Sequence, residues 1–155
     1  MKDKLFSLWP VNILHRVYSN HEQDKNSLLK FIKDYKKENP LGRSGSENSN
    51  LYESKYDLIK YIENNETLKK LVMFIGQGFK DVAYHTNIEA WEAKNINPSN
   101  ISTHVKAMWF IDYKESGFVF PHVHSGCSWS MVYYLSTSEE KEEDPFAGTH
   151  FFSPF

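Results

Sequence analysis

A chain of 155 residues with 40% hydrophobic and 15% aromatic residues is long and apolar enough to fold around a core. Its 18 Lys and Arg nearly balance its 20 Asp and Glu, so no net field favours nucleic acid or an anionic membrane. The single cysteine, Cys127, excludes an intrachain disulfide and a multi-cysteine zinc cluster, and fits a reducing compartment. We therefore expect a cytoplasmic protein with small-molecule partners and with no nucleic-acid or membrane partner.

The first third of the chain predicts strands followed by a helix. Residues 5–18 mix β-branched and aromatic side chains without a helical period, which favours one or two edge strands. Asn20 then offers a helix N-cap, with Gln23 in the position of a capping box. The helix should stop before Pro40, because the residue before a proline disfavours helical geometry. Residues 41–50 are rich in Gly, Ser and Asn and predict a loop.

A second helical region is predicted over residues 56–84, with a break near Asn64 and Asn65, where a new N-cap is available. Residues 89–102, rich in Asn, predict a loop. The apolar residues after the break recur at helical spacing and predict a core-facing stripe, which consists of Leu68, Leu71, Val72, Ile75, Phe79 and Val82.

The apolar period changes from helical to alternating after residue 102. Strands are expected within 104–113, 118–124, 129–135 and 150–152, with a turn at 114–117. Helices followed by antiparallel strands predict one α+β domain over 1–155, with helical support at about 20–85 and a jelly-roll at about 103–155. A jelly-roll core needs about eight strands. We therefore expect its C-terminal part to be absent from the chain.

Two histidines, His122 and His124, stand two residues apart in one predicted strand. Side chains at positions i and i+2 project from the same face of a strand, so both imidazoles can reach one metal ion. A mononuclear site needs a third ligand, and the alternative is that both are hydrogen-bonded or solvent-facing histidines. Neither His85 nor His104 has a partner at ligand spacing, and no His or Asp at a recognisable spacing marks Cys127 as a nucleophile.

The stretch from Tyr113 to Leu135 combines an aromatic strand, a Gly-containing turn, Pro-His-x-His, a Ser/Gly/Trp link and Val-Tyr-Tyr-Leu. This pattern resembles the iron(II)/2-oxoglutarate-dependent oxygenases of marine phages and bacteria, which are relatives of the prolyl-hydroxylase-like enzymes. The N-terminal half resembles that family more loosely, through its first apolar residues, the helix that follows and the Ser/Asn-rich loop.

The resemblance implies a double-stranded β-helix, which is a jelly-roll, with Fe(II) and 2-oxoglutarate as cofactors. It implies that His122 is the first metal ligand and that His124 stands where the wider superfamily has its carboxylate. Two imidazoles and one further ligand on one octahedral face leave three positions for a bidentate 2-oxo acid and O₂. Tyr134 matches a tyrosine that hydrogen-bonds the cosubstrate carboxylate, and Tyr113 matches a pocket-lining aromatic. The family's distal His and its Arg have no counterpart, since His150 comes too early.

Two functions of different kinds follow. The first is an oxygenase that hydroxylates an unidentified substrate, with little activity expected of this chain by itself. The second is a noncatalytic jelly-roll remnant or a metal- or ligand-binding module. A cupin is disfavoured because Ser128 and Trp129 stand where its glutamate belongs. An unfinished C-terminal edge also predicts exposure of Phe151, Phe152 and Phe155, and self-association through that edge.

Overall fold

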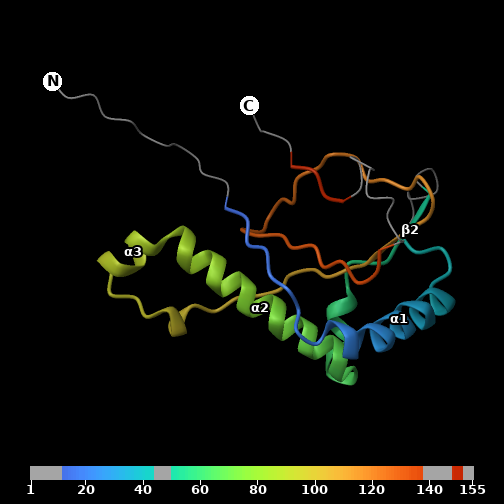
Figure 1. The fold of residues 1–155 in the computed structure, drawn as a ribbon, viewed down its shortest axis with the longest axis horizontal. Coiled ribbons are helices and arrows are strands. Elements are labelled where there is room, and N and C mark those ends of the chain that lie inside the picture. The colour runs from blue at the N-terminus through green and yellow to red at the C-terminus, as the bar shows by residue number, and fades with distance from the viewer. Residues whose placement is uncertain (1–11, 44–49, 138–147, 152–155) are drawn as a thin grey trace.

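The computed structural model of the chain describes residues 12–43, 50–137 and 148–151 (Figure 1). Helices dominate these ranges, and their regular sheet has two short antiparallel strands. The fold is therefore mixed α+β, as the order of predicted elements indicated. In chain order the elements are α1 (His21–Glu38), β1 (Leu51–Glu53), the 3₁₀ helix η1 (Leu58–Asn64), α2 (Glu66–Thr86), α3 (Ile88–Ala93), the 3₁₀ helix η2 (Pro98–Asn100) and β2 (Ile111–Tyr113).

Helix α1 starts and stops where the local sequence predicts. Acidic side chains occupy its first turn and basic side chains its last turn, which complements the helix dipole. At its C-terminal end, Asn39 donates from its backbone N–H (2.9 Å) and its side chain (3.1 Å) to the carbonyl oxygen of Tyr35. The helix ends before Pro40, as expected. The prediction of a capping box was wrong, because the side chain of Asn20 makes no capping hydrogen bond.

The predicted break in the second helical region is confirmed at Asn65. Its side-chain oxygen accepts a hydrogen bond of 2.9 Å from the backbone N–H of Leu68, which caps the first turn of α2. The residues before the break form the 3₁₀ helix η1 instead of an α-helix. Its first residue, Leu58, is buried and donates its backbone N–H to the carbonyl oxygen of Met108 at 3.1 Å. A tertiary contact therefore decides the geometry of this turn.

The loop expected over residues 89–102 contains the short helices α3 and η2, so that prediction was wrong in part. The indole N–H of Trp91 donates to the carbonyl oxygen of Ala83 at 3.1 Å, which ties α3 to the end of α2. The Asn-rich composition of this segment favours a loop, and the hydrogen bond from Trp91 to α2 that supports α3 cannot be read from composition.

The two strands pair in antiparallel register, with Leu51 opposite Tyr113 and Glu53 opposite Ile111. The predicted turn at 114–117 is confirmed by a hydrogen bond of 2.9 Å from the backbone N–H of Gly117 to the carbonyl oxygen of Lys114. A Cβ atom at Gly117 would approach the backbone oxygen of Asn50 to 2.5 Å, so only glycine fits where the turn passes the residue before β1.

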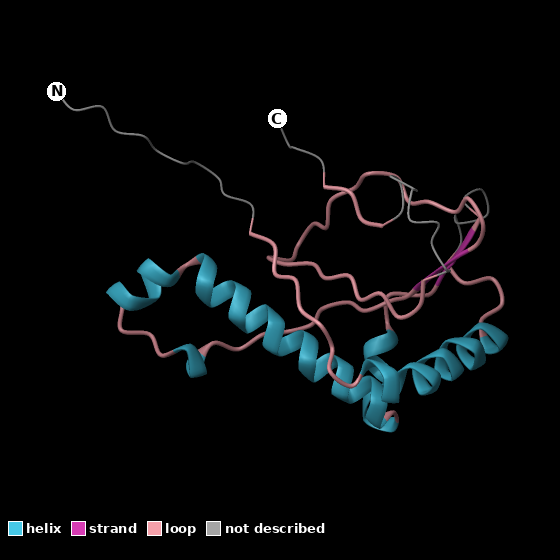
Figure 2. Ribbon diagram, viewed as in Figure 1, coloured by secondary structure: helices cyan, strands magenta, loops and turns pink. Residues whose placement is uncertain are grey.

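Most of the other predicted strands are irregular in the described residues (Figure 2). Residues 12–18, 118–124, 129–135 and 150–151 form no strand, and the segment 104–113 forms one only at its end. Alternation of apolar residues predicts an extended backbone, but a strand also needs a partner whose backbone groups are in register. The remaining predicted strand positions, at 5–11 and from Phe152 onward, lie outside the described residues, as do residues 44–49 of the predicted loop.

The core lies between the helices and the extended segments that follow them. Helices α1 and α2 begin side by side, where Thr67 donates to the hydroxyl oxygen of Ser27 at 3.2 Å, and then diverge (Figure 1). The C-terminal segment, orange to red in Figure 1, lies on the other side of this core. Four buried residues form the centre, and the extended segments add Met108, Tyr133 and Leu135; the centre consists of Tyr18, Leu28, Leu68 and Leu71.

Candidate metal centre

The side chains of the extended segment 108–113 point alternately to two opposite faces. Met108 packs against the hydrophobic core, and the ring of Phe110 contacts the ring of Tyr35 on α1, with 5.5 Å between their centres. Trp109 and Tyr113 alternate with these residues and therefore face away from α1. We call the side of this segment that carries Trp109 and Tyr113 the outer face.

The backbone beneath the outer face is held by hydrogen bonds to the preceding segment. Met108 donates its N–H to the carbonyl oxygen of Tyr56 at 3.2 Å, and the carbonyl oxygen of Phe110 accepts from the N–H of Ser54 at 3.0 Å. The hydroxyl oxygen of Ser54 in turn accepts from the N–H of Phe110 at 3.0 Å, and Ser54 is fully buried at 0% exposure. The residues before and after Trp109 are therefore both hydrogen-bonded to the preceding segment, which holds the backbone of Trp109 in place.

The two predicted metal ligands lie next to each other and are exposed. The ring centres of His122 and His124 are 4.8 Å apart, and the ring planes are nearly perpendicular at 85°. Two imidazoles that bind one ion at right angles, through bonds of about 2.1 Å, hold their ring centres about 4.6 Å apart. The observed spacing therefore suits two ligands of one ion.

A backbone hydrogen bond selects the tautomer of His122. Its Nδ1 lies 2.8 Å from the carbonyl oxygen of Phe120, and a carbonyl can only accept, so Nδ1 carries the proton. The lone pair of the neutral ring is then on Nε2, the atom left for a metal. Ligating histidines in proteins commonly donate their other ring N–H to such a carbonyl. His122 therefore has the local arrangement of a metal ligand.

His124 joins this pair to the outer face. Its ring centre is 5.5 Å from that of Trp109, and the planes are inclined at 52°. The carbonyl oxygen of His124 is also 3.6 Å from the exposed thiol of Cys127, which lies at the turn after the motif. The contact with Trp109 was not foreseen from sequence, although the alternation of residues 108–113 was a signal that Trp109 faces away from the core.

The two adjacent tyrosines point in opposite directions, as alternation predicts. Tyr133 packs against the core, and its hydroxyl is 2.7 Å from Nδ1 of His21 at the start of α1. Burial raises the pKa of Tyr133, and the nearby Asp24 carboxylate adds to the increase. Tyr134 is 51% exposed, and its hydroxyl is hydrogen-bonded to the hydroxyl of Thr149.

Tyr113 and Tyr134 form the second predicted pair. Burial raises the pKa of Tyr113, and the charges of Tyr134 and Glu53 raise it further. Trp109 and Tyr113 are four positions apart in an extended segment, a separation of about 13 Å between their backbones. Tyr113 thus lies on the same face of this segment as Trp109, which contacts His124. Among the described residues, no hydrogen bond or ring contact joins either tyrosine to the histidine pair.

The described residues supply two metal donors at this centre. Among residues 12–43, 50–137 and 148–151, no group of three His, Cys, Asp or Glu side chains is arranged to hold a metal ion. The donor type, the ring spacing and the tautomer of His122 are compatible with a divalent transition-metal ion, and the described residues supply no third protein ligand. His85 and His104 are exposed elsewhere, on α2 and in the segment before β2.

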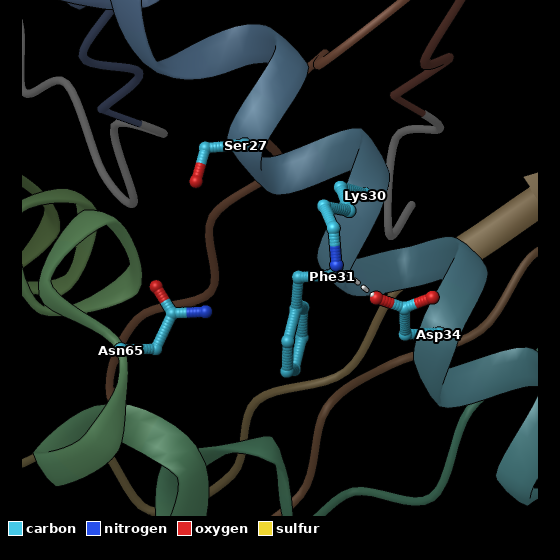
Figure 3. Close-up of a pocket in the computed structure, with 5 residues that line it drawn as sticks. All are labelled: Ser27, Lys30, Phe31, Asp34 and Asn65. Atoms are coloured by element: carbon cyan, nitrogen blue, oxygen red, sulfur yellow. Dashed lines mark hydrogen bonds and ion pairs between the residues drawn. The ribbon is translucent and has the colours of Figure 1, made fainter.

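A separate shallow depression lies along α1 (Figure 3). It has a volume of about 240 Å³ and is lined by Ser27, Lys30, Phe31, Asp34 and Asn65. Lys30 and Asp34 form an ion pair of 2.6 Å with each other along the helix surface, as Figure 3 shows. Since its two charged groups are satisfied by each other and it includes none of the predicted ligands, the outer face is the better candidate site.

No family model, curated protein or solved structure matches the chain. In the part of the chain that the structure describes, no helix has the length and apolar character needed to cross a membrane. The assignment of function therefore depends on the chemistry of the outer face.

Proposed function

We propose that this chain is an iron(II)- and 2-oxoglutarate-dependent oxygenase domain that acts on an unidentified substrate. His122 and His124 hold the metal ion, and Tyr134 and Tyr113 contact the cosubstrate. The observation that carries the proposal is the histidine pair, with ring centres 4.8 Å apart and with Nδ1 of His122 bonded to a backbone carbonyl. Bound iron(II), with 2-oxoglutarate and O₂ as co-reactants, would supply the hydroxylation chemistry, in which 2-oxoglutarate is decarboxylated to succinate.

The fold that we propose around this site is a double-stranded β-helix. Extended segments over the core, with side chains alternating between a core face and an outer face, support it. Tyr133, which packs against the core, and Tyr134, which is exposed, show this alternation most clearly. Within that fold, segments 118–124 and 129–135 are the strands that carry the ligands and the cosubstrate tyrosine.

The residues of the outer face have separate roles in this proposal. His122 and His124 bind the metal as neutral imidazoles, with the carbonyl oxygen of Phe120 orienting the first ring. The hydroxyl of Tyr134 exchanges its present bond to Thr149 for a bond to the cosubstrate carboxylate. Tyr113, on the same side of its segment as Trp109, lines the cosubstrate pocket.

A noncatalytic metal-binding module is the second candidate. It is favoured by one observation, which is that the described residues bring two donors, not three, to the centre. Two imidazoles bind an ion more weakly than a complete triad, because water holds the remaining positions. The two candidates differ in whether 2-oxoglutarate is consumed.

Anaerobic titration with Fe(II), or with Co(II) as an inert substitute, tests the metal site. We expect the wild-type chain to bind one ion, and His122→Ala or His124→Ala to weaken binding about tenfold or more. His85→Ala is the matched control, because it removes an exposed histidine on α2 and should leave the affinity unchanged. Equal affinity in all four proteins would refute the assigned ligands.

Succinate release from 2-oxoglutarate separates the two candidate functions. An oxygenase releases succinate in an Fe(II)-dependent manner that His122→Ala abolishes, and Tyr134→Phe should raise the concentration of 2-oxoglutarate needed for half-maximal rate. Tyr133→Phe is the control, since that hydroxyl faces α1. Metal binding with no 2-oxoglutarate binding or turnover would establish the noncatalytic module instead.

A further inference from the structure

We infer that Trp109 is a positioning residue for the metal ligand His124, an inference that rests on the proposed function. Among the contacts of the described residues, the His124 ring is held by two other rings. It meets the edge of His122, with centres 4.8 Å apart, and it lies against Trp109, with centres 5.5 Å apart. His122 has a hydrogen bond that fixes its ring, whereas His124 depends on this packing.

Trp109 is suited to the role because it is itself held in place. Its neighbours Met108 and Phe110 are bonded through their backbones to Tyr56 and Ser54. The indole ring also packs against the ring of Tyr56, with centres 4.6 Å apart. The exposed His124 thus packs against an indole ring that other residues of the fold hold in place.

The side chain of Tyr56 is in turn held by contacts with Arg43 and Glu53. The guanidinium of Arg43 lies 4.3 Å from the centre of the Tyr56 ring, and the Tyr56 hydroxyl donates to the carboxylate of Glu53 at 3.1 Å. The support of His124 therefore extends through Trp109 and Tyr56 to β1, which ends at Glu53.

A fixed ligand binds metal more tightly than a freely rotating one, because less rotamer freedom is lost on binding. Immobilising one side chain changes an affinity by about two- to tenfold. We therefore expect Trp109→Ala to weaken Co(II) binding by about two- to tenfold. Trp109→Phe keeps an aromatic face against His124 and should restore most of the affinity, while Trp91→Phe, on α3, is the control for loss of an indole.

Three measurements on the full chain test the inference. Nuclear Overhauser contacts between the Trp109 and His124 rings should be present without metal and lost in Trp109→Ala. Bound Co(II) should quench tryptophan emission in the wild type and in Trp91→Phe, and much less in Trp109→Phe. Circular dichroism and thermal unfolding of each variant show that the fold persists, so that a change in affinity reports on the site.

The outcomes distinguish this inference from the proposed function. Co(II) affinity that is unchanged in Trp109→Ala, or quenching that is unchanged in Trp109→Phe, overturns the role of Trp109 and leaves the histidine ligands standing. Absence of Co(II) binding in the wild type overturns the proposed function and the role of Trp109 together. Weaker binding in Trp109→Ala, with recovery in Trp109→Phe, supports both.

Discussion

Tyr133 and Tyr134 are neighbours in the chain, yet one belongs to the core and the other to the candidate site. Tyr133 packs against buried residues and bonds to His21, while Tyr134 is 51% exposed and bonds to Thr149. The same alternation separates Met108 and Phe110 from Trp109. At the scale of single residues, the period of an extended segment thus decides which side chains are available for chemistry.

A buried hydrogen bond joins Tyr18 to Asp24 across the start of α1. The Tyr18 hydroxyl donates to the Asp24 carboxylate at 2.6 Å, and both residues are buried. Burial, followed by the bond to Asp24, raises the pKa of Tyr18 to about 12. The folded chain therefore holds the phenol proton more tightly than the unfolded chain does.

We predict that Tyr18→Phe lowers the free energy of unfolding by about 1–3 kcal/mol at neutral pH, because it leaves the buried Asp24 carboxylate without its donor. In the wild type, the stability due to the raised pKa is complete below about pH 10 and is lost as the pH rises toward 12, since the unfolded phenol ionises first. Urea unfolding from pH 7 to 11 measures both effects, and Tyr18→Phe should decline less steeply above pH 10.

Tyr61→Phe is the matched control for this prediction, because Tyr61 contributes aromatic contacts with Phe31 and Tyr35 that its phenyl ring retains. Its effect should stay within about 0.5 kcal/mol. Similar stability losses for Tyr18→Phe and Tyr61→Phe would contradict the importance of the bond to Asp24.

At the scale of elements, helix ends follow local chemistry more closely than strands do. Asn65 caps α2 through a bond between residues three apart, and Asn39 closes α1 through a bond one turn back. Each strand of the sheet instead depends on a partner about sixty residues away, as the pairing of Leu51 with Tyr113 shows. The ends of α1 and the start of α2 could therefore be predicted, whereas the extent of the strands and the short helices after α2 could not.

The cap of α2 has a measurable contribution to stability. Asn65→Ala should lower the free energy of unfolding by about 1 kcal/mol, because the N–H of Leu68 loses its acceptor. Asn65→Asp keeps the acceptor oxygen and should retain most of that stability. Denaturant midpoints measure the difference, with Asn64→Ala at the adjacent exposed position as the control. Equal losses at Asn64 and Asn65 would show that the cap is not the cause.

At the scale of the whole molecule, apolar side chains collect on the exposed part of the extended segments. Large apolar side chains left exposed to water favour association where they lie together. Phe151 is 70% exposed, which confirms that part of the prediction for the last phenylalanines, while Phe152 and Phe155 lie outside the described residues. The exposed apolar residues of this region include Phe118, Val119, Phe120, Val123, Val132 and Phe151.

We predict concentration-dependent self-association through this surface. Size-exclusion chromatography with light scattering should show a mass that rises with concentration, and the double variant Phe120→Ser/Phe151→Ser should remain monomeric at concentrations where the wild type associates. Leu41→Ser is the control, because Leu41 is 85% exposed but follows α1, away from these segments in the sequence. A wild type that stays monomeric throughout, or equal effects of the double variant and the control, would count against it.

The candidate site shows how far prediction from sequence reached. The i, i+2 spacing of His122 and His124 predicted adjacent rings, and the structure confirms that adjacency at 4.8 Å. Their metal, and the iron and 2-oxoglutarate chemistry implied by resemblance, stay predictions. The expected strand around them is irregular in the described residues, because alternation specifies an extended backbone but not a hydrogen-bonded neighbour.

The sequence by itself determined both ends of α1, the start of α2, the turn before Gly117 and the opposite directions of Tyr133 and Tyr134, because each depends on residues within a few positions of one another. Only the tertiary structure decided that the ring of Trp109 contacts the ring of His124, fifteen residues further along the chain. The backbone of residues 108–110 is bonded to the segment after β1, and no local pattern encodes packing between segments so far apart in the chain.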